Sequence, residues 1–85
     1  MVKEEFIREV SNRTGLRQVD ISKSLESGFR IIGERLKDGE PVIFRGFGTF
    51  KIRRRAERNG RPPDVVPSFE PGKELRRTVS YKVIT

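Results

Sequence analysis

The chain opens with apolar residues at helical spacing. Phe6, Ile7 and Val10 form one stripe, which predicts a short helix over residues 2–14. A second apolar stripe, with spacings of four, four, three and four, predicts a longer helix over residues 17–38. The members of this second stripe are Ile21, Leu25, Phe29, Ile32 and Leu36.

Glycines mark the ends of both predicted helices and interrupt the second. Gly15 and Gly39 suit the positive φ with which helices commonly end. Gly28 and Gly33 lie inside the second helix, where each costs roughly 1 kcal/mol relative to alanine. Two interpretations remain open for these interior glycines: tolerated substitutions, or the close approach of another backbone, such as that of a partner chain.

From residue 41 the apolar pattern changes to a period of two. This alternation predicts strands over residues 41–45 and 49–55. Gly46-Phe47-Gly48 joins them, and its glycines suit a tight turn that lets a phosphate or a neighbouring backbone approach. No GK[ST] sequence follows, so this segment is not a nucleotide-binding phosphate loop.

Asn59-Gly60 predicts the next turn, since this dipeptide favours the positive φ values of a two-residue hairpin. A hairpin centred there pairs residues whose numbers add up to 119. Phe50 then lies opposite Phe69, which places two large aromatic side chains on one face of the sheet. This register predicts a return strand and a protruding hairpin.

A third helix is predicted to start at Pro71-Gly72, because proline is tolerated in the first turn of a helix. Leu75 and Val79 form its short apolar stripe. The tail, residues 80–85, is compatible with either a continued helix or a short extended segment. The elements together predict an α+β fold with two N-terminal helices, a three-stranded antiparallel sheet carrying a short hairpin arm, and a C-terminal helix.

The 85 residues suffice for one small domain, predicted over residues 1–85. Only 33% of the residues are hydrophobic, so a single chain is expected to have a thin core. Such domains need disulfides, a metal or a partner subunit. The chain has no Cys and no His, which leaves the partner subunit as the expected source of stability.

The same absences argue against catalysis. Without His or Cys, a nucleophile–base pair would need Ser with Lys or two carboxylates, and no spacing suggests one. We therefore expect no enzyme activity, catalytic residue, metal, cofactor or small-molecule substrate. No apolar run approaches 18 residues and no leader is recognisable. The sequence therefore predicts no membrane association and a cytoplasmic location.

The positive charge is concentrated in the second half of the chain. The first 44 residues hold eight basic and eight acidic residues, whereas residues 45–85 hold eleven and four, which accounts for the whole net charge of +7. Residues 51–61 carry six cations against a single acid, and the hairpin register places Arg58 opposite Arg61. A solvated face is the alternative interpretation, but this density of arginine favours a polyanionic partner, nucleic acid first.

The segments GFGTFKIRRRAERNGRPP (residues 46–63) and FEPGKEL (residues 69–75) resemble the bacterial HU and integration-host-factor family. The resemblance implies an intertwined dimer, with a homodimer expected first and a heterodimer as the alternative. It assigns residues 1–40 to helical dimerisation, 41–70 to the sheet and arm, and 71–85 to the C-terminal helix and tail. It further implies a nucleoid protein whose arms hold duplex DNA through the minor groove, bending and compacting it with little base specificity.

The resemblance also implies the DNA-binding residues. They are Arg53, Arg55, Arg58, Arg61 and the intercalating Pro63 in the arm, and Lys3, Gly46, Phe47, Gly48, Gly72, Lys73 and Arg76 at the body. The arm is shorter than the family's, with about six residues, or roughly 20 Å, between Ile52 and the turn. We therefore expect weaker DNA bending, with the body and the base of the arm carrying more of the affinity.

Two other functions are kept as alternatives. One is a site-specific subunit resembling integration host factor, which base-specific binding or failure to homodimerise would favour. The other is a structural protein of a phage or mobile element that reuses the fold, which an absence of DNA binding at low salt would favour.

Overall fold

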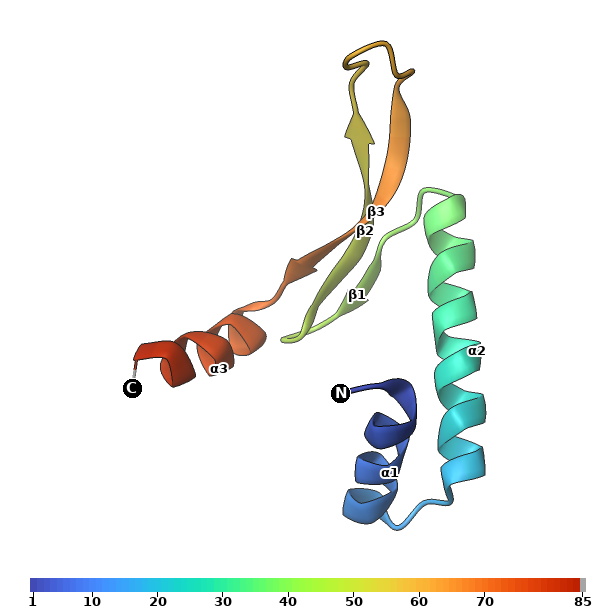
Figure 1. The fold of residues 1–85 in the computed structure, drawn as a ribbon, viewed down its shortest axis with the longest axis vertical. Helices are drawn as coiled ribbons and strands as arrows, with labels where there is room; N and C mark the ends of the chain where they lie inside the picture. Colours follow the sequence, from blue (N-terminus) through green and yellow to red (C-terminus); the bar gives the residue numbers. More distant parts are fainter. Residues whose placement is uncertain (85) are drawn as a thin grey trace. The chain divides into compact units, whose positions relative to one another are not determined.

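A computed structural model describes the backbone of residues 1–84 and the side chains of residues 1–80 (Figure 1). The elements are α1 (Lys3–Thr14), α2 (Gln18–Lys37), β1 (Val42–Phe44), β2 (Gly48–Arg55), β3 (Asp64–Pro71) and α3 (Lys73–Ile84). The three strands form one antiparallel sheet in the order β1-β2-β3, which confirms the α+β fold class. None of the helices over residues 1–84 combines the length and apolar character that crossing a membrane requires.

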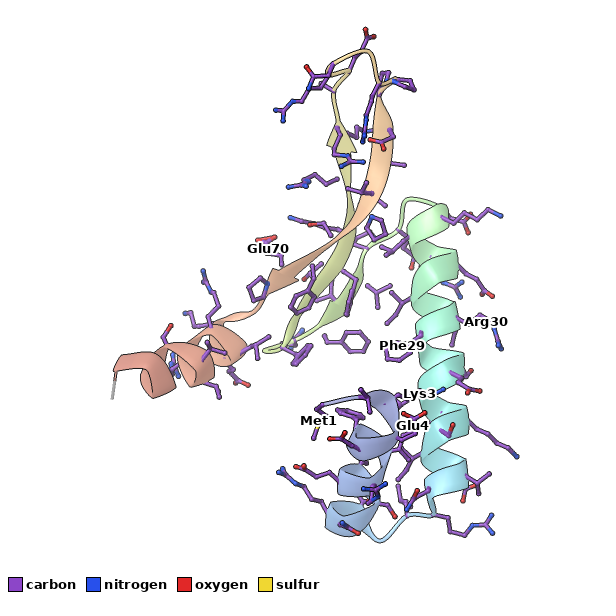
Figure 2. All side chains as sticks on the ribbon, viewed as in Figure 1. Met1, Lys3, Glu4, Phe29, Arg30 and Glu70 are labelled. Atoms are coloured by element: carbon purple, nitrogen blue, oxygen red, sulfur yellow. The ribbon has the colours of Figure 1, made fainter. Side chains whose placement is uncertain are left out.

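The chain folds into two compact units, Met1–Ile31 and Ile32–Thr85. In the first unit, α1 ends as predicted at Gly15, which has φ 78° and donates its N–H to the carbonyl of Ser11 at 2.8 Å. Lys3 of α1, labelled in Figure 2, forms an ion pair with Glu26 of α2, with 3.0 Å between Nζ and Oε1. The prediction of a single domain over residues 1–85 stays a prediction.

The apolar stripe of α2 is covered unevenly. Ile21 and Leu36 are buried, whereas Phe29 remains 63% exposed. A Cβ added at Gly28 or Gly33 would meet nothing within 4 Å among the described residues outside the neighbouring helix backbone. The described residues therefore supply no backbone that approaches these glycines, and both interpretations, tolerated substitutions and the approach of a partner chain, stay open.

The hairpin register is confirmed in full. Every pair between β2 and β3 follows the predicted pattern, from Gly48 with Pro71 to Arg55 with Asp64. Asn59 and Gly60 have φ values of 53° and 80°, as a tight hairpin turn requires. Because β1 pairs only with the first three residues of β2, residues 51–68 form a two-stranded ribbon, which we call the arm (Figure 1).

Four phenylalanines gather around the base of the sheet. The ring centroids of Phe50 and Phe69 lie 4.9 Å apart, as their cross-strand pairing predicts, and Phe44 and Phe47 lie 6.1 Å from Phe50 and 5.6 Å from Phe69, respectively. This contact does not produce a closed core, because Phe44 and Phe47 remain 46% and 51% exposed. Among the described side chains, only three hydrophobic ones are buried: Ile7, Ile21 and Leu36.

The predicted glycine turn is confirmed, and the backbone that approaches it is that of the chain itself. Gly72 donates its N–H to the carbonyl of Phe47 at 2.7 Å, and a side chain at Gly72 would come within 2.7 Å of the Gly46 carbonyl oxygen. Pro71 was predicted in the first turn of the third helix, which is wrong: it is the last residue of β3, and α3 starts at Lys73. Its pairing with Gly48 extends the strand.

The tail continues as helix. α3 runs to Ile84, so the alternative of a short extended segment over residues 80–85 is wrong as far as residue 84. Thr85 and the side chains from residue 81 onward, including that of Lys82, lie outside the described residues.

Candidate nucleic-acid interface

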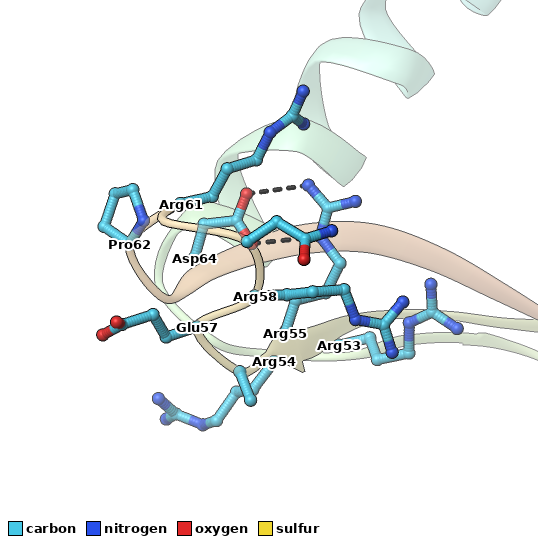
Figure 3. Close-up of a pocket in the computed structure, with 10 residues that line it drawn as sticks. Arg53, Arg54, Arg55, Glu57, Arg58, Arg61, Pro62 and Asp64 are labelled. Atoms are coloured by element: carbon cyan, nitrogen blue, oxygen red, sulfur yellow. Dashed lines mark hydrogen bonds and ion pairs between the residues drawn. The ribbon is translucent and has the colours of Figure 1, made fainter.

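The arm brings together the arginines predicted to bind DNA. Arg53 and Arg55 lie near the end of β2, and Arg58 and Arg61 face each other across the turn, where the Arg61 N–H donates to the Arg58 carbonyl at 2.9 Å. All four are exposed. Figure 3 shows these side chains around the end of the arm. The short ribbon therefore concentrates guanidinium groups at one end of the sheet.

One of these arginines has a partner within the arm. Arg55 donates to both carboxylate oxygens of Asp64, from Nε at 3.0 Å and from Nη2 at 2.8 Å (Figure 3). This bidentate contact holds the pKa of the Asp64 carboxyl below its usual range and raises the pKa of Arg55. The positive charge of Arg55 is therefore already paired with the Asp64 carboxylate.

The other arm arginines keep their full charge available. Arg53, Arg58 and Arg61 form no ion pair with any described residue, and neither does Arg54. Arg54 was not among the predicted site residues. Because side chains alternate along a strand, it lies on the opposite face of β2 from Arg53 and Arg55. The arm thus presents unpaired cations on both faces and at its turn.

Acidic residues accompany the cations at the base of the arm. Lys51 pairs with Glu70, with 2.6 Å between Nζ and Oε2. The hydrogen bond and charge of Lys51, with a smaller contribution from the charge of Arg76, hold the pKa of Glu70 below its usual range. The predicted contact Arg76 therefore lies within the electrostatic influence of a carboxylate.

The two predicted backbone contact segments, residues 46–48 and 72–73, are hydrogen-bonded to each other around the start of α3. The Gly72 N–H is already bonded to Phe47, and the Leu75 N–H to Gly46, so neither amide is available to a phosphate without breaking a contact. Over residues 1–84 no backbone bond engages the amides of Lys73 and Glu74, which leaves them as the helix-start donors. The Glu74 carboxylate folds back against Gly46.

Two predicted site residues belong neither to the arm arginines nor to the start of α3. Lys3 belongs to the first compact unit, where Glu26 neutralises it. Pro63 is exposed and sits immediately before β3, on the return side of the hairpin. The apex of the arm is the Asn59-Gly60 turn, not the proline.

The residues missed by the sequence prediction are the acids and Arg54. Because paired residues of the hairpin have numbers that add up to 119, Asp64 lies opposite Arg55. This pair could therefore have been predicted from the register alone. Strand alternation likewise places Arg54 on the opposite face. The pairing of Glu70 with Lys51 is diagonal across the strands, and only the side-chain conformations reveal it.

Comparisons with known proteins give a consistent result. The model of the family described as bacterial DNA-binding protein matches residues 1–80. The chain is 38% identical over 92 residues to the SPbeta prophage-derived DNA-binding protein HU 2 of Bacillus subtilis, covering 96% of this chain and 100% of the relative. It is 38% identical over 89 residues to DNA-binding protein HU of Geobacillus stearothermophilus, covering 93% and 99%. An Anabaena HU–DNA cocrystal structure matches with a TM-score of 0.85 at 28% identity, over 94% of this chain and 98% of that chain.

The Arg55–Asp64 contact gives a first prediction. Since the folded pKa of Asp64 lies below its unfolded value, the pair stabilises the hairpin end above that unfolded value, about 3.9, and the effect is lost as the pH falls through the folded pKa. Arg55→Ala should return the pKa of Asp64 toward about 3.9, as measured by NMR titration of the side-chain carboxyl carbon. Arg53→Ala, two residues away on the same face, is the control and should leave the pKa lowered. Equal shifts in both variants would contradict the assignment.

Proposed function

Because the chain belongs to the bacterial DNA-binding protein family that includes HU, we propose that it binds duplex DNA without sequence specificity and bends or compacts it as an architectural protein of the bacterial nucleoid, in the cytoplasm. The observation that carries this proposal is the arm: a narrow two-stranded ribbon whose unpaired arginines meet no compensating acid among the described residues. A two-stranded ribbon is narrow enough to lie along a groove of B-DNA. No catalytic group is needed for this function.

The mechanism is electrostatic. Each phosphate neutralised by a lysine or arginine releases condensed counterions, which supplies affinity that does not depend on base sequence. Arginine is favoured where the minor groove is narrow and its potential is most negative. The side chains proposed to make these contacts are Arg53, Arg54, Arg58, Arg61, Lys73 and Arg76. The other expected contacts stay predictions: Lys3, Gly46, Phe47, Gly48, Arg55, Pro63 and Gly72.

We also propose that the chain forms a dimer, and a homodimer of two copies of this chain is the preferred arrangement. The support is the exposed apolar surface of the single chain. Phe29 in the first unit and Phe44 and Phe47 in the second expose about half or more of their surface, which is unusual for a stable soluble monomer. A second copy would cover such surfaces and supply the core that one chain lacks.

DNA binding should depend steeply on salt. With about four to six phosphates neutralised per dimer, the slope of log affinity against log salt should be about −4 to −5. Fluorescence anisotropy on two duplexes of about 30 base pairs and unrelated sequence measures this, and both should give similar affinities. Arg58→Ala should make the slope shallower by about 0.9 for each arm engaged. Arg8→Ala, an exposed change on α1, is the control.

Two results would contradict this function. A slope near zero would remove the electrostatic mechanism, and an absence of binding at low salt would favour a structural role. A strong preference for one of the duplexes would instead favour a site-specific subunit.

The dimer is tested at Phe29. In a monomer, Phe29→Ala should cost little because the side chain is already 63% exposed. If a second chain buries it, the same change should cost about 3–5 kcal/mol per buried side chain and shift sedimentation toward the single-chain mass. Thermal melting at several concentrations separates the outcomes, since dimer stability rises with concentration. Arg30→Ala, at the neighbouring exposed position (Figure 2), should melt like the parent protein. A melting temperature that does not depend on protein concentration, together with a sedimentation mass of a single chain, would contradict the dimer.

The short arm should bend DNA weakly. The alignment with the prophage relative spans 92 positions and includes 96% of this chain, or about 82 of its 85 residues. About ten positions of the relative therefore have no counterpart in this chain. Pro63 also lies behind the apex, a poor position for a wedge between base pairs. Fluorescence resonance energy transfer across a labelled duplex should report a smaller bend than HU of Geobacillus stearothermophilus produces, and Pro63→Ala should change it little. A bend equal to that relative's and lost in Pro63→Ala would contradict this expectation.

A further inference from the structure

The register divides the side chains of the arm between two faces. Lys51, Arg53 and Arg55 alternate on one face of β2, and the residues opposite them on β3 are Ser68, Val66 and Asp64. Three cations therefore share one face of the ribbon at two-residue intervals. They differ in what lies beside them.

Two of these three cations are neutralised inside the arm or at its base. Lys51 is paired with Glu70, and Arg55 donates from Nε and Nη2 to the two carboxylate oxygens of Asp64. Arg53, between them, has no ion-pair partner among the described residues. Figure 3 shows the two contacts from Asp64 reaching Arg55 only.

The position of Asp64 matters for a polyanionic ligand. An Arg55–Asp64 pair carries no net charge, so it displaces no condensed counterions from the DNA phosphates and adds nothing to the positive field of the arm. A phosphate that takes Arg55 away from Asp64 leaves that carboxylate beside the DNA backbone, where like charges repel. The pair is exposed, so this exchange is not blocked by burial; it is made unfavourable by charge.

We infer that Asp64 acts as an internal competitor of the DNA phosphates, which withholds Arg55 from the duplex and leaves Arg53 as the effective cation on that face. Asp64 then lowers the affinity of the arm for DNA, and Arg55 is a positioning residue that holds the two strands together at the turn end of the hairpin. This inference rests on the proposed function for its ligand, and it assigns Arg55 a different role from the one the family resemblance implies.

Two single substitutions and one double substitution test it. Arg53→Ala should make the salt slope shallower by about 0.9 for each arm engaged, or about eightfold in affinity at about 0.1 M salt. The double change Arg55→Ala with Asp64→Ala removes a pair without net charge, so it should leave the salt slope nearly unchanged and alter affinity by less than about twofold. It should also lower amide exchange protection at that end of the ladder. Asp64→Asn should raise affinity and steepen the slope by up to about 0.9 for each arm engaged, because it releases Arg55.

A heparin column separates failure of the inference from failure of the proposed function. Heparin is a sulfated polyanion, so Asp64→Asn should elute at higher salt than the parent protein and Arg53→Ala at lower salt, whether or not duplex DNA is the ligand. If the parent protein ignores duplexes but the elution order holds, the proposed function fails and the inference stands. If Asp64→Asn binds no better on either matrix, or the double variant with Arg55→Ala and Asp64→Ala loses as much as Arg53→Ala, the inference is overturned. Circular dichroism melts confirm that the variants compared are folded.

Discussion

The antiparallel register between β2 and β3 is the constraint on which the rest of the second unit depends. A slip of one residue would turn the side chains of one strand to the opposite face, separating Phe69 from Phe50 and Arg55 from Asp64. The Asn59-Gly60 turn prevents such a slip, because both residues adopt the positive φ that fixes a two-residue loop. The same register that assembles the aromatic cluster therefore also decides which arginines are neutralised.

The arm departs from the rule that neighbouring charges compensate each other. Arg58 and Arg61 face each other across the ladder, an arrangement that is unfavourable in isolation. At the base, by contrast, acids accompany the cations. Near the turn, Asp64 also pairs with Arg55, so the uncompensated charge lies at Arg53 and Arg54 on the strand and at Arg58 and Arg61 around the turn. A ribbon of this kind gains stability when a polyanion binds, which links its electrostatics directly to the proposed function.

The second incomplete feature is the apolar surface. A chain with three buried hydrophobic side chains among its described residues cannot offset the conformational entropy of folding by burial alone. Exposed aromatic residues occur in both compact units, so neither unit closes a core of its own. The physical chemistry of the single chain therefore requires a further surface, and the family to which it belongs supplies the expectation of a second copy.

Local patterns were sufficient to predict most of the architecture. Apolar spacing gave both N-terminal helices, and the period-two pattern with Asn59-Gly60 gave the complete hairpin register, because turn chemistry and alternation act over short distances. Pro71 was misplaced because its neighbours allow either strand or helix, and pairing with Gly48 across the sheet selects the strand. The engagement of the Gly72 amide by Phe47, and the diagonal pair at the base of the arm, depend on segments distant in sequence. A sequence pattern gives the faces of an element, but the partners of a polar group are settled only when distant backbones and side chains meet in space.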